Sequence, residues 1–282
     1  MPGTLFVVAT PIGNLEDVTA RALRILREAS LIAAEDTRRT AHLLARYAIT
    51  TPTTSLHEHN ETTKASSLIQ RLQKGDSIAL VSDAGTPTVS DPGQRLIRMA
   101  VDAGIRVEAI PGPSAILATL AASGIAAETF TFLGFPPTRS NARKQWFAEV
   151  QAAGRPVVFF EAPHRIVKTL EELQETVGNR NVSVGRELTK AHEELVRGQI
   201  SEVLERLGEP KGEFTVIVDI GQTPDILAGD RPSPPEIARE FGHLTDNGRT
   251  SRRGAVRALA ERYGLSPNAV YAAIEEGKKS VD

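Results

Sequence analysis

The sequence predicts an α/β protein with two lobes and a small C-terminal helical unit, and three observations lead to this expectation. Short apolar and β-branched runs alternate with longer stretches of helical period over residues 1–123. A second unit, with its own alternating and strongly apolar runs, begins at residue 124. Residues 236–282 show only helical patterns.

The first lobe, residues 1–123, is expected to contain a mostly parallel sheet. Its strand-like runs are almost wholly apolar, and strands of this kind are usually buried on both faces and joined by helical crossovers. The expected strands are 5–9, 31–34, 77–82 and 106–110, and the expected helices are 18–29, 40–47, 61–73, 94–102 and 114–122.

The second lobe, residues 124–223, is expected to be an α/β unit with a mixed sheet that is richer in antiparallel pairs. Its strand-like segments alternate more than those of the first lobe. The expected strands are 129–135, 156–160, 181–185, 193–200 and 213–220, with helices at 164–176 and 201–207.

A linker is expected over residues 224–235, where Gly, Pro, Asp and Thr favour an extended, solvated chain. Helices are expected at 236–244, 251–263 and 266–276, with Ser266 as an N-cap and Pro267 at the first helical position. This unit, 236–282, resembles a helix-turn-helix and is expected to bind RNA.

Composition excludes several classes of site and sets the expected compartment. The 282 residues include no cysteine, which excludes disulfides, thiolate metal sites and a cysteine nucleophile and fits a reducing cytoplasm. No export signal is visible, and no run approaches the ~20 apolar residues that span a bilayer. The net charge of −2 gives no overall attraction to nucleic acid, so RNA binding requires local basic patches.

Three loops are expected at the carboxyl ends of strands, where open α/β sheets bind ligands. They span residues 10–14, 82–93 and 110–114. In the second loop, Gly85 lets backbone amides approach a ligand and Asp83 can meet a hydroxyl or an amine. Alone, this loop is equally compatible with a surface turn, and its spacing is not that of a dinucleotide fingerprint. Three converging loops favour a binding site.

A resemblance to a known family is carried by five segments: VATPIGNLEDVTARAL, AEDTRRT, VSDAGTPTVSDPG, IPGPSA and FEAPHR. Together they resemble the ribosomal RNA small subunit methyltransferase I family of the tetrapyrrole methylase superfamily, from about Thr4 to Ile220 and less specifically beyond. The resemblance implies a two-lobed tetrapyrrole-methylase-like fold, S-adenosyl-L-methionine in the cleft between the lobes, and a homodimer. It also implies 2'-O-methylation of a cytidine in the decoding region of 16S ribosomal RNA within the small subunit.

Carried over by motif, the resemblance implies a set of cofactor contacts. In the tetrapyrrole branch the glycine loop usually contains Gly-Asp-Pro, whereas this chain has Asp-Ala-Gly-Thr-Pro, a difference that favours the RNA branch. The implied contacts are Pro11, Asp83, Ala84, Gly85, Thr86, Ser114 and Ala115, together with Phe160, Glu161 and Thr215.

A ribose 2'-hydroxyl is a poor nucleophile, so a general base or a stabilising cation is expected near it. The base candidates are Glu161 and Glu187, which follow the expected strands 156–160 and 181–185, and Glu58, whose segment 57–61 is also expected to follow a strand; Lys190 could act electrostatically. His57 and His59 have a spacing that could ligate a metal if carboxylates joined them. Because methyl transfer needs no metal, we expect these histidines to orient the nucleotide and expect no metal in the enzyme.

Local groups of cations are the candidates for RNA binding, and ion pairing or solvation is the alternative for each group. Residues 138–144 are expected to form a flexible loop with three cations and no acid. The helix 251–263 carries several arginines without an intervening acid before Arg257. The candidates are Arg38, Arg39, Arg139, Arg143, Lys144, Arg165, Arg252 and Arg253.

Two other functions remain open from the sequence. A tetrapyrrole methyltransferase would share the cofactor site but accept a porphyrinoid substrate. A non-enzymatic RNA-binding or ribosome-assembly protein would bind RNA and no cofactor. The Asp-Ala-Gly-Thr-Pro loop, the arginine-rich strand ends and the helical tail argue against the first alternative.

Overall fold

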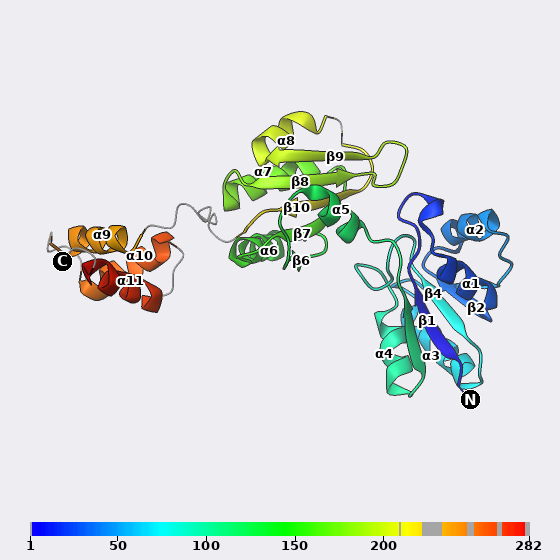
Figure 1. Ribbon diagram of the computed structural model, residues 1–282. Helices are drawn as coiled ribbons and strands as arrows, with labels where there is room; N and C mark the ends of the chain where they lie inside the picture. Colours follow the sequence, from blue (N-terminus) through cyan, green and yellow to red (C-terminus); the bar gives the residue numbers. More distant parts are fainter. Residues whose placement is uncertain (1, 209, 222–232, 247–250, 264–266, 280–282) are drawn as a thin grey trace. The chain divides into compact units, whose positions relative to one another are not determined.

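The computed structural model describes residues 2–208, 210–221, 233–246, 251–263 and 267–279. The chain divides into two compact units, residues 1–220 and 221–282. Figure 1 shows two sheets in the first unit, each flanked by helices, and three helices in the second. No helix within the described ranges is long and apolar enough to cross a membrane.

The first sheet is parallel throughout and has the strand order β3-β2-β4-β1-β5. Helices α1 and α2 pack on one face around Val8, Ile32 and Val81, and α3 and α4 pack on the other around Leu5 and Leu80. The elements are β1 (Thr4–Val8), η1 (Leu15–Asp17), α1 (Ala20–Glu28), β2 (Leu31–Ala34), α2 (Thr37–Arg46), β3 (Thr53–Ser55), α3 (Glu61–Gln73), β4 (Ile78–Val81), α4 (Gln94–Asp102) and β5 (Arg106–Ile110).

Side-chain caps fix where several helices begin after these strands. Thr19 Oγ1 accepts a hydrogen bond from the Ala22 amide at the start of α1 (3.1 Å). Asp36 caps α2 and accepts from the Arg38 amide (2.9 Å). Such caps satisfy amides that the helix itself leaves without partners. They also hold the loops at the carboxyl edge of the sheet in a defined direction.

The second sheet is mixed and has the order β6-β7-β10-β8-β9, in which only the β6–β7 pair is parallel. Helices α6, α7 and α8 enclose the larger core on one face, which includes Trp146, Phe159, Leu170 and Val216. The elements are β6 (Thr131–Phe132), α6 (Ser140–Ala152), β7 (Val157–Glu161), α7 (Ile166–Val177), β8 (Asn181–Arg186), β9 (Glu194–Gln199), α8 (Ile200–Arg206) and β10 (Phe214–Val218).

Helix α5 (Ala115–Ser123) packs on the opposite face of this second sheet, although it directly follows the first. Its Ile116 contacts Val158 and Ile217 in a small apolar cluster. The expected lobe boundary at residue 123 therefore lies after an element that already packs with the second sheet. A second difference concerns residues 140–152, which form helix α6 where a flexible loop was expected over 138–144.

The C-terminal unit consists of α9 (Pro234–Asp246), α10 (Arg252–Tyr263) and α11 (Pro267–Lys279) around a core that includes Ile237, Phe241, Leu259 and Ile274. Helix α9 begins within the span expected as linker, whose residues 224–232 lie outside the described part of the chain. Ser266, the expected N-cap, also lies outside it. The predicted fold class, a parallel α/β lobe, a mixed-sheet α/β lobe and a small helical unit, is confirmed.

Candidate functional site

The loops after β1 and β4 are joined at the carboxyl edge of the first sheet. The Thr10 amide donates to the Gly85 carbonyl (2.8 Å), and the Gly85 amide donates to the Thr10 carbonyl (3.0 Å). Thr10 Oγ1 also donates to the Ser82 carbonyl (3.2 Å). Gly85 has a φ of +75°, a left-handed conformation that favours glycine. These bonds hold the two loops together as one surface.

A pocket of about 320 Å³ lies between the loop after β1, the loop before α5 and the segment after β8. Small-molecule sites occupy roughly 300–1,000 Å³, so this volume is within their range. Gly85 lies beside it, because a methyl group there would come within 3.5 Å of Ile12 Cγ2. The lining residues are Ile12, Asp17, Thr19, Gly112, Pro113, Ser114, Ala118 and Thr189.

The segment after β8 reaches across from the second sheet to the first. The Asn14 amide donates to Thr189 Oγ1 (2.9 Å), and a methyl group on Gly13 would lie only 2.7 Å from the Leu188 carbonyl oxygen. Glu187 and Thr189 have positive φ values of 48° and 65°, which non-glycine residues seldom adopt. The close contact at Gly13 explains why this position carries no side chain.

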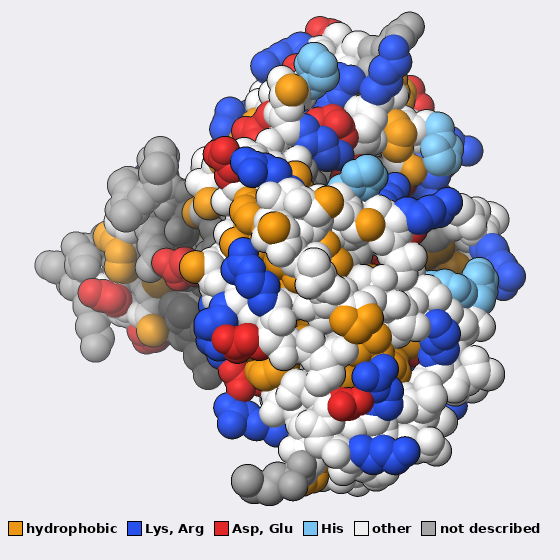
Figure 2. Space-filling view, turned by 90° about the vertical axis from the view of Figure 1, so that its right-hand side faces the viewer, with side chains coloured by type: hydrophobic (Ala, Val, Ile, Leu, Met, Phe, Trp, Pro, Cys, Tyr) orange, Lys and Arg blue, Asp and Glu red, His pale blue; other side chains and the backbone are white. Residues whose placement is uncertain are grey.

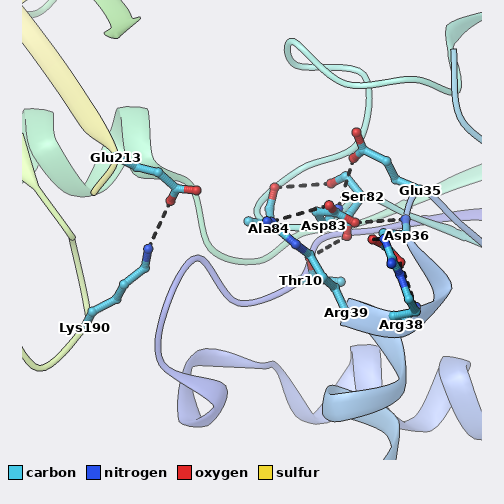
Figure 3. Close-up of polar contacts among 10 residues, drawn as sticks. All are labelled: Thr10, Glu35, Asp36, Arg38, Arg39, Ser82, Asp83, Ala84, Lys190 and Glu213. Atoms are coloured by element: carbon cyan, nitrogen blue, oxygen red, sulfur yellow. Dashed lines mark hydrogen bonds and ion pairs between the residues drawn. The ribbon is translucent and has the colours of Figure 1, made fainter. Parts of the chain in front are cut away.

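Two of the catalytic candidates meet in this segment. Lys190 Nζ donates to Glu187 Oε1 (2.9 Å) and to Glu213 Oε2 (3.2 Å), as part of Figure 3 shows. The hydrogen bond from Lys190 lowers the pKa of Glu187. Burial favours neutral Lys190, but the carboxylates of Glu187 and Glu213 outweigh it and raise the pKa of the amine. Lys190 therefore stays cationic and Glu187 stays anionic at neutral pH.

A second polar group joins the ends of β2 and β4. Asp83 accepts from the Asp36 amide (2.9 Å), and Glu35 accepts from the Asp83 amide (3.2 Å). Arg39 forms an ion pair with Asp83 (3.5 Å), whereas Arg38 turns back to Asp36 (2.7 Å), as Figure 3 shows. The structure thus shows the ion-pairing alternative for both arginines, although each side chain remains largely exposed.

Asp91 is a residue of this group that the sequence analysis missed. Burial, reinforced by the negative charges of Glu35 and Asp83, raises the pKa of Asp91 from 3.8 to about 6. Burial likewise raises the pKa of Glu35. The Ser-Asp pair at Ser82 recurs at Ser90 within the same glycine loop, and this repeat is the signal that could have directed attention to Asp91.

Glu161 does not occupy the exposed position expected of a base or of a cofactor contact. Its side chain is wholly buried, accepts from Thr169 Oγ1 (2.6 Å) and pairs with Arg165 (3.2 Å). Arg165 in turn donates to the Pro136 carbonyl. Because the carboxylate is enclosed by α7, Glu161 has no open side from which to reach a substrate. Together with Arg165 it forms an anchor that holds the loop at Pro136.

Arg143 and Arg165, both expected to bind RNA, are largely buried parts of this anchor. Arg143 donates to Glu172 (2.6 Å) and to Thr169 Oγ1 (2.8 Å), and its guanidinium packs on the Phe147 ring. A guanidinium held in this way has few donors left for a phosphate. We therefore correct both assignments from RNA contact to internal support.

The remaining candidates are distributed over several elements. Phe160 and Thr215 lie opposite each other on β7 and β10, and Ala115 begins α5 beside the pocket. Pro11, Ala84 and Thr86 belong to the joined loops after β1 and β4. Glu58 is exposed after β3. Of the implied cofactor contacts, Ser114 is among the residues that line the pocket, whereas Thr215 is buried; the expected roles stay predictions.

The exposed cations lie on separate helices. Arg139 and Lys144 are exposed at the start of α6, and Arg252 and Arg253 are exposed at the start of α10. On the face in Figure 2, Lys and Arg side chains are spread out among acidic ones and form no continuous patch. His57 Nδ1 is buried without a hydrogen-bond partner, and no group of three or more potential metal ligands occurs in the described ranges.

Comparisons with known proteins place these features in a family. Residues 4–204 match the model of the Tetrapyrrole (Corrin/Porphyrin) Methylases. Proteins named ribosomal RNA small subunit methyltransferase I are similar over most of their length. The protein of Synechocystis sp. is 44% identical, covering 95% of this chain and 96% of its own. That of Halalkalibacterium halodurans is 49% identical, covering 83% and 80%.

Solved structures share the fold at low sequence identity. Uroporphyrin-III-C-methyltransferase from Thermus thermophilus has a TM-score of 0.55 and 18% identity, covering 77% of this chain and 95% of its own. A diphthine synthase has a TM-score of 0.61 and 16% identity, covering 77% and 89%. On the family model and the relatives, the chain belongs to the tetrapyrrole methylase family and, within it, to the ribosomal RNA small subunit methyltransferase I group.

Proposed function

We propose that this protein is an S-adenosyl-L-methionine-dependent methyltransferase of 16S ribosomal RNA. The observation that carries the proposal is the open pocket of about 320 Å³ at the carboxyl edge of the first sheet, which Thr189 of the segment after β8 borders from the side of the second sheet. The relatives named ribosomal RNA small subunit methyltransferase I support the acceptor. A solved structural neighbour is complexed with S-adenosyl homocysteine, which supports the cofactor.

The residues of the pocket fit a nucleoside cofactor with an amino-acid tail. The backbone at Gly85 is fixed by its two bonds to Thr10 and offers a surface free of side chains. Ser114 caps α5, because its hydroxyl accepts from the Leu117 amide (3.4 Å) at the edge of the pocket. When bound, S-adenosylmethionine supplies an electrophilic methyl group. The chain's own residues position the acceptor for in-line attack and exclude water from it.

We propose the ribose 2'-hydroxyl of a cytidine in the decoding region as the acceptor, within the small ribosomal subunit. The Asp-Ala-Gly-Thr-Pro form of the glycine loop supports the RNA branch of the family. The proposal includes a homodimer, a cytoplasmic setting and a reaction without a metal.

The proton of the 2'-hydroxyl needs an acceptor, and the developing negative charge needs a cation. Lys190 is suited to the second role because its two carboxylate partners keep the amine protonated. Glu187 and Glu58 remain proton-acceptor candidates, the first through an ion-paired carboxylate and the second through an exposed one. Glu161 is withdrawn from this role because its carboxylate is buried.

The test supplies labelled S-adenosylmethionine and, in separate reactions, small ribosomal subunits, naked 16S ribosomal RNA and a tetrapyrrole precursor. We expect label on the RNA, and a 2'-O-methyl group makes the adjacent phosphodiester resistant to alkali, which maps the nucleotide. Label on the tetrapyrrole alone contradicts the proposal. Binding of RNA with no methylation in any reaction favours a non-enzymatic role.

A further inference from the structure

Phe135 is one of the exposed aromatic residues within the described part of the chain. Phe135 follows β6 and is 52% exposed. Its ring rests on Phe160 (centroids 5.4 Å apart), which in turn meets Phe132 edge to face (5.1 Å). Phe160 and Phe132 pack against the apolar cluster under α5. The exposed ring is thus the outer member of an aromatic row that is supported from below.

The loop that carries Phe135 is fixed from several directions. Residues 133–137 bond to β7, to α6 and to the buried network around Glu161. A ring held on a fixed loop loses little conformational entropy when it binds a partner. The bonds are from Leu133 N to Val158 O (3.0 Å), Phe160 N to Gly134 O (2.9 Å), Trp146 Nε1 to Leu133 O (3.1 Å), Arg143 Nη1 to Pro137 O (3.3 Å) and Arg165 Nη2 to Pro136 O.

The residue before Phe135, Gly134, lies close to the glycine loop of the first sheet. A methyl group in place of a Gly134 hydrogen would lie 3.6 Å from Ser90 Oγ. Ser90 and Thr88 both have positive φ values, 69° and 73°, so this part of the glycine loop is held in a conformation that non-glycine residues seldom adopt. The backbone beside Phe135 is therefore near the loop that begins with the expected cofactor contacts.

Two exposed cations follow Phe135 in the same segment. Residues 129–148 contain three cations and no acid, and Glu128 and Glu149 flank them. Arg143 supports the loop, whereas Arg139 and Lys144 are exposed and form no ion pair with the described residues. RNA-binding proteins commonly combine such cations, which contact the backbone, with aromatic rings on which unstacked bases lie.

We propose that Phe135 is the platform on which a nucleobase of the substrate RNA stacks, at or next to the methylated nucleotide and splayed out of its strand. This inference rests on the proposed function. Its added content is a binding site for a base, formed by the Phe135 ring on Phe160, beside the cofactor loop. Chemistry on a nucleotide within a folded RNA requires such a position when the reacting group is otherwise enclosed.

The test compares Phe135→Leu, Phe135→Tyr and Phe135→Ala with the wild-type enzyme on small ribosomal subunits that lack the modification. Leu keeps an apolar side chain but has no aromatic face, whereas Tyr keeps the face. Phe130→Leu is the matched control, because Phe130 is exposed in the same segment but has no ring contact with the described aromatic residues. Cofactor affinity by calorimetry and oligomeric state by light scattering are measured for every variant.

We expect Phe135→Leu and Phe135→Ala to lower kcat/KM for RNA on the order of tenfold to a hundredfold, chiefly through KM, as loss of one base stack implies. Phe135→Tyr and Phe130→Leu should stay close to wild type, with cofactor affinity and oligomeric state unchanged throughout. Full activity of Phe135→Leu would overturn the inference. So would loss of cofactor binding, which assigns the ring to the cofactor, or dissociation, which assigns it to a subunit interface.

Failure of the proposed function looks different from failure of this inference. If wild-type enzyme transfers no methyl group to RNA, the proposed function is wrong and the Phe135 variants have no activity to lose. If wild-type enzyme methylates RNA and all the variants match it, only the stacking platform is wrong.

Discussion

Replacing Asp91 with Asn should stabilise the protein at neutral pH and leave it almost unchanged in acid. The folded state raises the pKa of Asp91 from 3.8 to about 6 through burial and the negative charges of Glu35 and Asp83. The folded protein therefore holds this proton more tightly than the unfolded chain does. The resulting stabilisation is complete below about pH 4, falls as the pH rises towards 6, and is absent above.

The magnitude follows from the shift and from the exposure of the group. Each pKa unit corresponds to about 1.36 kcal/mol in the free energy of unfolding, so a rise of about 2 pKa units would correspond to roughly 3 kcal/mol for a fully buried carboxyl. Asp91 is only half-buried, and water screens part of the effect. We expect Asp91→Asn to gain about 1 kcal/mol over the wild type between pH 4 and pH 7.

Urea unfolding of both proteins from about pH 4 to about pH 8 measures this difference, because shared titrations cancel when the two are compared at each pH. Asp102→Asn is the matched control, since Asp102 is an exposed carboxylate at the end of the helix that follows Asp91. A stability difference between Asp91→Asn and wild type that does not change with pH would refute the reasoning. It would mean that the carboxyl faces water as an ordinary surface group does.

Three further predictions concern the cofactor, the RNA and the anchor. Gly85→Val should abolish cofactor binding in calorimetry, because the φ of +75° disfavours a β-branched residue and the new side chain would press on Ile12, which lines the pocket; normal binding would show that the pocket is misplaced. The double change Arg252→Ala with Arg253→Ala should weaken RNA binding, spare the cofactor, and flatten the dependence of log Kd on log salt by about 0.7–0.9 for each lost phosphate contact. An unchanged salt slope would exclude both arginines from the RNA surface. Glu161→Ala should destabilise the fold by about 3 kcal/mol because it leaves Arg165 without its partner. Glu58→Ala, at an exposed position, should leave the unfolding midpoint close to that of the wild type, and equal effects of the two glutamate changes would contradict the burial argument.

The fold class was predictable because its evidence is local in the sequence. Uniformly apolar runs identify buried parallel strands, and glycine and proline directly after those runs identify the loops at the carboxyl edge. The contact between Asn14 and Thr189 had no such signal, since 175 residues separate them. The packing of α5 on the second sheet was also not predictable, because this alanine-rich helix is apolar on most sides and its sequence does not show which side is buried.

The errors at the site share one physical cause. Whether a charged side chain faces a ligand or a buried partner depends on groups far away in sequence. Arg143 and Glu161 both hydrogen-bond to Thr169 inside the second lobe. The sequence around each residue does not show whether its side chain is exposed or buried. The carboxyl of Asp91 was overlooked for the same reason, since its neighbour Glu35 comes from another strand.

The order of strands in the second sheet determines when the proposed cofactor site can form during synthesis. The last strand, β10, is inserted between β7 and β8, so the middle of this sheet is missing until residue 218 has left the ribosome. The Glu187 amide bonds to the Glu213 carbonyl beside β10 (3.1 Å), and Thr189 of the segment 186–190 borders the pocket. The first lobe can fold earlier as the chain emerges, but a nascent chain that ends before β10 lacks the support for the wall formed by Thr189. If the cofactor binds at the proposed site, its binding reports that both sheets are complete.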